Sequence, residues 1–262
     1  MPHGTKVLIV EDSRIQARIM SEHIRGVTPY ETLVTATLAE TAQVMEQSRD
    51  DIFVAVLDLN LPDDAGGEIV ALANRYAVPA VVMTSSFDEE VRKKLLEQNV
   101  VDYFLKSMAE VANMENLIER LHKNLSVTVL VADDSRLARH QMATLLGNQN
   151  YRVMEAEDGA VALDILRDTP DVRLLITDYH MPRMDGFELI TEIRKTRPKD
   201  RLAIIGVSAA GGEQTARFIK NGANDFLTKP IGMEEFYCRV NQQMDMLDII
   251  QDYKTLCEKK AS

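Results

Sequence analysis

The sequence predicts an α/β protein made of two tandem domains, each a doubly wound parallel sheet of five strands alternating with five helices. Short continuous apolar runs alternate with longer amphipathic segments, as expected for strands buried on both faces and the helices that connect them. The second half of the chain repeats the polar residues of the first half at offsets of 120 to 124 residues. A repeat of this length is the size of a domain, so we expect a tandem duplication.

The elements of the first half follow from these two periodicities. The strands are predicted at Val7–Val10, Thr32–Ala36, Phe53–Leu57, Ala80–Met83 and Tyr103–Leu105. Helices are predicted at Arg14–Arg25, Leu38–Gln47, Gly67–Arg75 and Glu89–Gln98, with one more ending near Asn124. Alternating strands and helices favour a parallel sheet with right-handed crossovers. We therefore place a first domain at residues 1–125, a second at 126–247 and a helical extension at 248–262.

Composition and charge argue against several classes of protein. The net charge of −11 disfavours a surface for nucleic acid or anionic membrane. No apolar run approaches the roughly 18 residues of a membrane-spanning helix. Cys238 and Cys257 form neither a disulfide framework nor a zinc motif, and we expect two free thiols in a reducing compartment. The sequence therefore predicts a cytoplasmic protein with no nucleic acid or membrane partner.

Two stretches deliver a carboxylate into a loop in the same way. In "VAVLDLNLPDDAGG" an apolar run ends at Asp58, with Pro62 and Gly66 four and eight residues later. In "LITDYHMPRMDG" an apolar run ends at Asp178, with a Pro and a Gly at the same spacing. A carboxylate placed twice in this way indicates a functional position.

The other repeated polar residues also fall at the carboxyl ends of predicted strands. They are Glu11, Asp12, Asp58, Thr84 and Lys106 in the first half, and Asp133, Asp134, Asp178, Ser208 and Lys229 in the second. These strand ends meet at one edge of an open parallel sheet, where ligand chemistry collects. We therefore expect three carboxylates, a hydroxyl and an ammonium to converge in each domain.

Such a cluster needs compensating positive charge. Two unit charges about 4 Å apart repel by about 4 kcal/mol at an effective dielectric constant near 20. The lysine offsets part of this repulsion, and Mg²⁺, which prefers oxygen ligands, suits the remainder. A carboxylate beside a metal, a lysine and a hydroxyl is suited to attack and accept a phosphoryl group.

These motifs resemble the receiver domain of bacterial two-component response regulators, a flavodoxin-like (βα)5 module related to CheY. The resemblance covers Lys6–Asn124 and Val127–Leu247. It implies that a histidine kinase or phosphotransfer protein phosphorylates Asp58 and Asp178. It also implies that each domain binds Mg²⁺ through its phosphoacceptor, its acid pair and one backbone carbonyl. The implied metal residues are Glu11, Asp12, Asp58 and Asn60 in the first domain, and Asp133, Asp134, Asp178 and His180 in the second.

The resemblance further implies a switch that reports phosphorylation. Thr84 and Ser208 resemble the switch hydroxyl, and Tyr103 and Phe226 resemble the switch aromatic. Phosphorylation would draw the hydroxyl inward and let the aromatic ring rotate, which changes the surface around the last helix. The first domain departs from the pattern in having Lys106-Ser107 where the second has Lys-Pro, and "DDAGG" where the second has "RMDGF".

The C-terminal segment carries a separate pattern. Met246, Ile249, Tyr253 and Leu256 are spaced by 3, 4 and 3 residues, like the a and d positions of a coiled coil. This helix either folds back on its own domain or acts as a dimerising or signalling helix. It ends where tandem-receiver diguanylate cyclases commonly begin their catalytic domain, so we expect a homodimer with an effector domain after the helix.

The sequence leaves alternatives to a response regulator. A stand-alone adaptor, a phosphate sink and a pseudo-receiver scaffold for dimerisation are the alternatives. Haloacid-dehalogenase-like phosphatases need a second Asp two residues after the nucleophile, where this chain has Asn60 and His180. We therefore expect a phosphoacceptor with slow self-dephosphorylation and not an enzyme, with any catalytic effector outside these residues.

Overall fold

The computed structural model describes residues 4–64, 66–85, 95, 98, 100–209 and 213–261. It divides into two compact units. Domain one consists of Met1–Ser126 with Asn148–Asn150, and domain two of Val127–Gly147 with Tyr151–Ser262. No helix in the described part of the chain is both long and apolar enough to cross a membrane.

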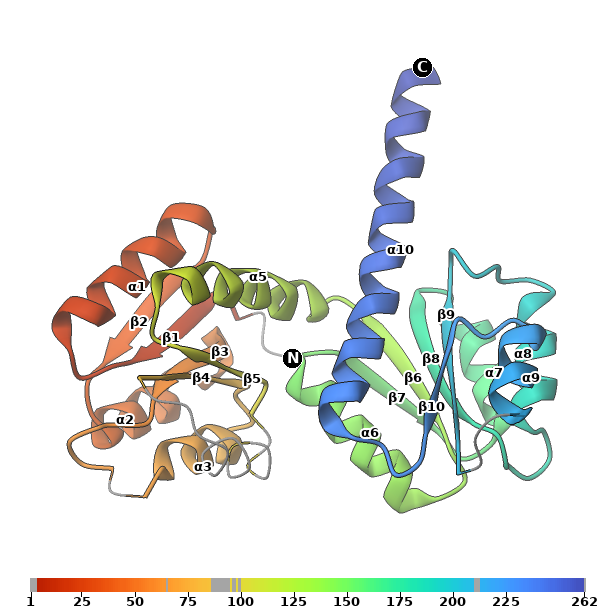
Figure 1. The fold of residues 1–262 in the computed structure, drawn as a ribbon, viewed down its shortest axis with the longest axis horizontal. Coiled ribbons are helices and arrows are strands. Elements are labelled where there is room, and N and C mark those ends of the chain that lie inside the picture. Colours follow the sequence, from red (N-terminus) through yellow and green to blue (C-terminus); the bar gives the residue numbers. More distant parts are fainter. Residues whose placement is uncertain are drawn as a thin grey trace. The chain divides into compact units, whose positions relative to one another are not determined.

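Domain one is a parallel five-stranded sheet in the order β2-β1-β3-β4-β5 (Figure 1). Its strands are β1 (Lys6–Val10), β2 (Glu31–Thr35), β3 (Ile52–Asp58), β4 (Ala80–Thr84) and β5 (Asp102–Leu105). Its helices are α1 (Arg14–Val27), α2 (Leu38–Ser48), α3 (Glu68–Arg75) and α5 (Met108–Asn124), with a 3₁₀ turn at Arg49–Asp51. The apolar faces of α1 and α5 pack on one side of the sheet and those of α2 and α3 on the other. The helix expected at Glu89–Gln98 lies outside the described residues except for Leu95 and Gln98.

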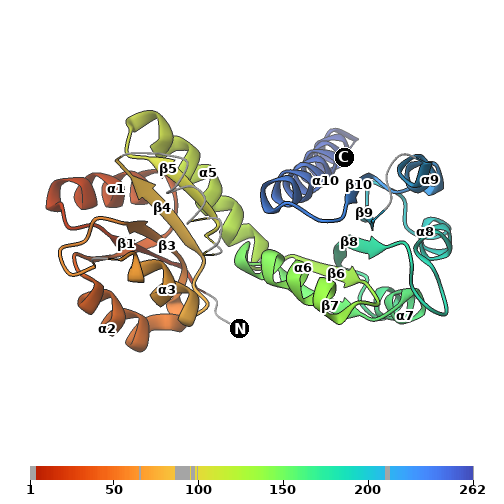
Figure 2. The same cartoon turned by 60° about the horizontal axis from the view of Figure 1, so that its bottom comes forward.

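Domain two has the same strand order, β7-β6-β8-β9-β10, again all parallel. Its strands are β6 (Thr128–Ala132), β7 (Arg152–Ala156), β8 (Val172–Asp178), β9 (Ala203–Ser208) and β10 (Asp225–Thr228). Its helices are α6 (Arg136–Asn148), α7 (Gly159–Asp168), α8 (Gly186–Arg194), α9 (Glu213–Asn221) and α10 (Met233–Ala261). Helices α6 and α10 cover one face of the sheet, and α7, α8 and α9 the other (Figure 2). The predicted fold class is confirmed in both domains.

Short-range interactions place the ends of the helices that flank the acidic residues. Ser13 is the N-cap of α1, and its hydroxyl accepts a hydrogen bond from the amide of Gln16. Asp185 and Glu188 form a reciprocal capping box at the start of α8. Because a capped end fixes where a helix begins, these residues also fix the loops that leave β1 and β8.

The predicted C-terminal extension is the continuation of α10, which runs unbroken from Met233 to Ala261. Its outer part is tied to domain two by an ion pair from Arg173 to Asp248 at 2.9 Å and by another from Lys254 to Asp200. The four apolar residues of the predicted seam are 51 to 68% exposed: Met246, Ile249, Tyr253 and Leu256. The seam therefore does not fold back onto domain two. Cys238 and Cys257 are exposed free thiols on the same helix.

Candidate functional site

In domain one, a lysine joins two buried carboxylates at the carboxyl edge of the sheet. Lys106 follows β5, Glu11 follows β1, and Asp58 ends β3. The Lys106 ammonium lies 2.7 Å from Oε2 of Glu11 and 2.6 Å from Oδ2 of Asp58. Glu11 and Asp58 are only 2% and 3% exposed. Three residues far apart in sequence thus form one buried charge cluster.

Backbone amides orient these two carboxylates. The amide of Ser13 donates to Oε1 of Glu11 at 3.2 Å, and the amide of Asn60 donates to Oδ1 of Asp58 at 3.1 Å. Each carboxylate therefore gives one oxygen to the lysine and the other to its own loop. This arrangement fixes the direction of both groups before any ligand binds.

Asp12 completes an acidic group that could hold a cation. Carboxylate oxygens of Glu11, Asp12 and Asp58 all lie within 4.8 Å of one another, and Asp12 is exposed to solvent. Three negative charges face one lysine, so the cluster carries surplus negative charge. Hard oxygen donors with one open, hydrated side fit the preferences of Mg²⁺.

Burial and pairing act in opposite directions on the pKa values of this cluster. Burial raises the pKa of Glu11, and the hydrogen bond and charge of Lys106 offset only part of that rise. For Lys106, burial lowers the pKa, but its bonds to Asp58 and Glu11 outweigh burial, so the pKa is raised overall. The lysine therefore stays positively charged at neutral pH.

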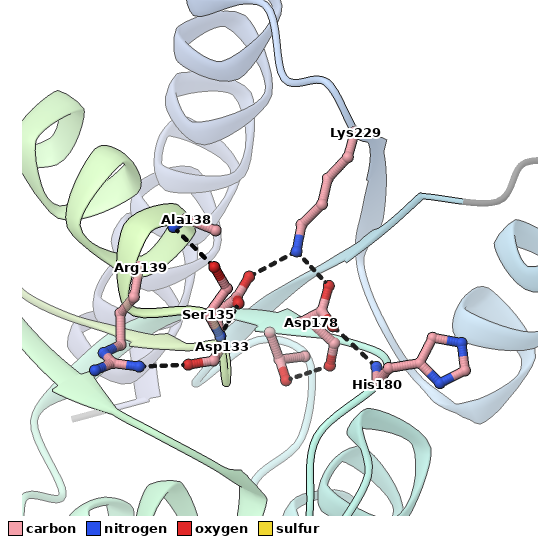
Figure 3. Close-up of polar contacts among 8 residues, drawn as sticks. Asp133, Ser135, Ala138, Arg139, Asp178, His180 and Lys229 are labelled. Carbon is pink, nitrogen blue, oxygen red and sulfur yellow. Dashed lines mark hydrogen bonds and ion pairs between the residues drawn. The ribbon is translucent and has the colours of Figure 1, made fainter.

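Domain two repeats this geometry. The Lys229 ammonium lies 2.7 Å from Oδ2 of Asp133 and 2.7 Å from Oδ1 of Asp178, and Figure 3 shows it reaching between the two. The amide of Ser135 donates to Asp133 at 2.9 Å, and the amide of His180 donates to Asp178 at 2.9 Å. Burial raises the pKa of Asp178, and Lys229 offsets only part of the rise.

One cation near the second site was not anticipated from the sequence. Arg139 on α6 donates from Nη1 to the backbone carbonyl of Asp133 at 2.6 Å and from Nε to Glu155 at 3.1 Å (Figure 3). The matching position in domain one is the buried Ala17. The described acids of domain two, Asp134 included, do not form a group as tight as that of domain one. The only sequence signal for Arg139 was its place one helical turn after Ser135.

The predicted hydroxyl residues lie at the ends of β4 and β9. Thr84 and Ser208 are buried, and their carbonyls accept hydrogen bonds from the amides of Lys106 at 2.8 Å and Lys229 at 2.9 Å. Each hydroxyl residue is therefore held beside the lysine of its own site.

The two predicted switch aromatics differ in burial. Phe226 is buried, with its ring centroid 5.3 Å from that of Phe218, whereas Tyr103 is half-buried at the edge of the core. The side chains of Asn60 and His180 are exposed, and the role predicted for these residues concerns their backbone carbonyls.

The loops after the phosphoacceptor candidates carry opposite charges. In domain one, Asp63 accepts from the amides of Leu38 and Ala39 at 2.8 and 3.1 Å, at the start of α2. In domain two, Arg183 at the matching position pairs with Asp158, the N-cap of α7. The same connection between loop and helix is thus made by an acid in one domain and by a base in the other.

Residues 7–121 and 129–241 each match the family described as the response regulator receiver domain. The chain belongs to the response regulator receiver family. Two solved structures, each described as a two-component system response regulator/GGDEF domain protein, share 36% and 37% identity with it. Each comparison covers 93% of this chain and 99% of the other, with TM-scores of 0.78 and 0.77. The resemblance noted from the sequence is therefore confirmed for both domains.

Curated relatives match a single domain. "Two-component response regulator ORR11" from Oryza sativa subsp. indica is 34% identical over 104 residues, covering 39% of this chain and 71% of that protein. "Chemotaxis protein CheY homolog" from Campylobacter jejuni subsp. jejuni serotype O:23/36 (strain 81-176) is 38% identical over 106 residues, covering 39% and 80%. Receiver domains are regulatory, and the described part of this chain contains two of them and no catalytic domain.

Proposed function

We propose that this chain is a tandem-receiver response regulator that accepts a phosphoryl group on Asp58, on Asp178 or on both. The donor is a sensor histidine kinase or a phosphotransfer protein. The observation that carries the proposal is the buried arrangement of a lysine between two oriented carboxylates, which occurs in both domains. A merely structural ion pair would not require the same geometry twice at matching strand ends.

The proposed transfer is a displacement at phosphorus. A carboxylate oxygen of Asp58 or Asp178 forms a bond to phosphorus while the phosphorus–nitrogen bond of the donor phosphohistidine breaks. The electron pair of that bond stays on the imidazole nitrogen, which then takes up a proton. Lys106 or Lys229 lies within hydrogen-bonding distance of the attacking carboxylate and offsets negative charge on the phosphoryl oxygens.

The residues present fit a magnesium ion in both domains. In domain one they are Glu11, Asp12, Asp58 and the backbone carbonyl of Asn60. In domain two they are Asp133, Asp134, Asp178 and the backbone carbonyl of His180. Mg²⁺ bound there would offset charge on the transferring oxygens. The tight acid group of domain one supports this assignment most directly.

A switch is proposed to follow from the buried hydroxyls. A new phosphate on Asp58 or Asp178 would accept a hydrogen bond from Thr84 or Ser208, whose strands end beside the site. The aromatic ring of Tyr103 or Phe226 would then repack on the adjacent edge strand. This is a local change in charge that biases a two-state surface. The place of Phe226 in a chain of packed aromatic rings supports it.

The proposed output runs through α10. Its exposed seam of Met246, Ile249, Tyr253 and Leu256 matches the spacing of a two-stranded coiled coil, so the second copy of this chain is the proposed partner. Two solved structures that match 93% of this chain are described as response regulator/GGDEF domain proteins, which supports a GGDEF effector as the output. Substituting Ile249→Asp and Leu256→Asp should abolish a dimer in sedimentation analysis, while Glu258→Asp, at an exposed position outside the seam, should preserve it.

Intact-mass spectrometry tests the proposal. The chain is treated with acetyl phosphate and Mg²⁺ as wild type, Asp58→Asn and Asp178→Asn. Each phosphoryl group adds about 80 Da. Two additions, each lost with its own variant, are expected. One addition would leave the other domain as a structural partner, and none would favour a pseudo-receiver scaffold over a phosphoacceptor.

A further inference from the structure

A hollow of about 470 Å³ lies beside the phosphoacceptor candidate of domain one. It falls in the size range of small-ligand pockets. Its lining combines apolar and polar residues. The apolar lining comes from Leu59, Leu61, Pro62 and Leu95, the polar lining from Asp12, Asn60, Asp64 and Gln98, and the remainder from Gly66 and Gly67. Because Asp12 and Asn60 are also residues of the candidate metal site, the hollow opens onto the reaction centre.

Domain two fills the equivalent space with its own side chains. Tyr179, Phe187 and Phe218 occupy the positions that correspond to Leu59, Gly67 and Leu95 in domain one. The offsets of 120, 120 and 123 residues are those that relate Asp58 to Asp178 and Lys106 to Lys229.

The three rings of domain two form one packed cluster. The ring centroids of Tyr179 and Phe187 are 4.5 Å apart, and those of Phe187 and Phe218 are 4.8 Å apart. Phe218 is completely buried, and the Arg217 guanidinium lies 4.5 Å from the centroid of Phe187. Among the described residues, domain one therefore has no aromatic ring at the three positions where domain two has a ring stack.

The hollow is held open by its loop. Gly67 has φ of 79°, a left-handed conformation that a bulky side chain adopts only with strain. The carboxylate of Asp64 accepts hydrogen bonds from the amides of Gly67 and Glu68 at 2.8 Å and of Ile69 at 2.9 Å. The loop therefore keeps its shape and cannot supply a ring of its own at this position.

We propose that this hollow is a docking site for an aromatic side chain of the protein that delivers the phosphoryl group to domain one. The occupant is a ring with an N–H or O–H edge, as in Trp or Tyr, because apolar walls meet the exposed carboxylate of Asp12. Such residues are frequent anchors of protein interfaces. The identity of the partner as phosphodonor rests on the proposed function, whereas the ring site rests on the hollow alone. Domain two, already filled, does not bind the same group.

Indole, as the side-chain analogue of Trp, is the probe. In the full-length chain, methyl NMR should show saturable shifts at Leu59, Leu61 and Leu95, with a dissociation constant on the order of millimolar for so small a ligand. Methyl groups of domain two should not shift. Leu59→Tyr, which copies the residue of domain two, should weaken binding about tenfold or more while retaining the methyl spectrum of the rest of domain one.

Two further variants test the inference in both directions, by filling the hollow of domain one and by opening one in domain two. Leu95→Phe should also lose indole binding, and the combined change Tyr179→Leu, Phe187→Gly and Phe218→Leu, which copies domain one, should create indole shifts at Met181 in domain two. Absence of saturable shifts in the wild type, or undiminished binding in folded Leu59→Tyr, would overturn the proposal. Acetyl phosphate, which has no ring, should still phosphorylate Asp58 in Leu59→Tyr. A wild type that binds indole but takes no phosphoryl group at Asp58 would refute the proposed function and leave the ring site intact.

Discussion

Replacing Asp12 by Asn should stabilise domain one in the absence of divalent cations. The carboxylates of Glu11, Asp12 and Asp58 lie within 4.8 Å of one another, and Lys106 offsets only part of their charge. At about 4.8 Å, a pair of unit charges repels by about 3.5 kcal/mol at an effective dielectric constant near 20 and by about 1 kcal/mol in water. Asp12 faces solvent, and Lys106 attracts it while two acids repel it. The net gain expected from Asp12→Asn is therefore about 1 to 2 kcal/mol.

Adding Mg²⁺ should make domain one of the wild type more stable than that of Asp12→Asn. A ligand that binds only the folded state stabilises it in proportion to the logarithm of its concentration over its dissociation constant. The wild type should gain stability as Mg²⁺ is added, and Asp12→Asn should gain little because it has lost a direct ligand. Hydrogen–deuterium exchange followed by mass spectrometry measures this separately in peptides of each domain, with EDTA and with Mg²⁺.

The matched control is Asp134→Asn in domain two. Its acids are less tightly grouped, and Arg139 lies against Asp133, so the gain in EDTA should be smaller than for Asp12→Asn. Unchanged or reduced protection of domain one in Asp12→Asn with EDTA would refute the repulsion argument. An equal effect of Mg²⁺ on wild type and Asp12→Asn would refute the assignment of Asp12 as a ligand.

The other predictions concern domain two. Burial raises the pKa of Asp178, so its phosphorylation rate should begin to fall at a higher pH than for an ordinary Asp as pH decreases, as time-resolved intact mass would reveal. Because the pKa of Asp178 is higher in the folded state, folding favours its protonated form. This stabilisation is fully present below the pKa of the unfolded state and is lost as pH rises through the pKa of the folded state. At neutral pH, Asp178→Asn should therefore be more stable than wild type to urea. Arg194→Met should lower the free energy of unfolding in urea by about 3 to 5 kcal/mol. The Arg194 guanidinium donates to three backbone carbonyls and to Asn224 at 2.8 to 3.0 Å, and burial lowers its pKa to about 10. Asp158→Ala should cost about 1 to 2 kcal/mol by thermal denaturation because it removes the cap of α7, and Arg183→Met, which keeps that cap, should cost less.

Asp158 changes the stability of the fold with pH in the opposite direction to Asp178. Burial raises the pKa of Asp158, but the amide of Val161 and the guanidinium of Arg183 lower it by more. Its stabilising contribution is therefore present above the unfolded pKa and lost as pH falls through the lowered folded value.

The duplicated sheet and both charge clusters could be predicted from the sequence, because strand ends are local features that the topology then brings together. The apolar run before Asp58 ends where β3 ends, and Lys106 follows β5 directly. Parallel pairing forces these ends to one edge of the sheet. No detail of side-chain packing was needed to place them there.

Other features depend on contacts that no local pattern encodes. The bond from Arg139 to the carbonyl of Asp133 requires the rotation of α6 about its own axis, which only packing fixes. The sequence predicts a domain helix and a separate extension where α10 runs unbroken, because the repeat in domain one indicates a shorter last helix. The hollow beside Asp58 arises from a difference between the two domains, which have Gly67 and Leu95 in one and Phe187 and Phe218 in the other.

The two receivers therefore share their chemistry and differ in their surroundings. A lysine lies between two carboxylates in both domains, so this triad gives no reason for a donor to prefer one domain. The surroundings do: Asp63 and the open hollow border Asp58, whereas Arg183 and a packed ring stack border Asp178. A donor protein that presents an aromatic ring would gain contact area only at domain one, and an acidic donor surface would be favoured only at domain two. The preference of a donor protein for one of the two receivers is thus expected to depend on these surrounding residues and not on the phosphoacceptor itself.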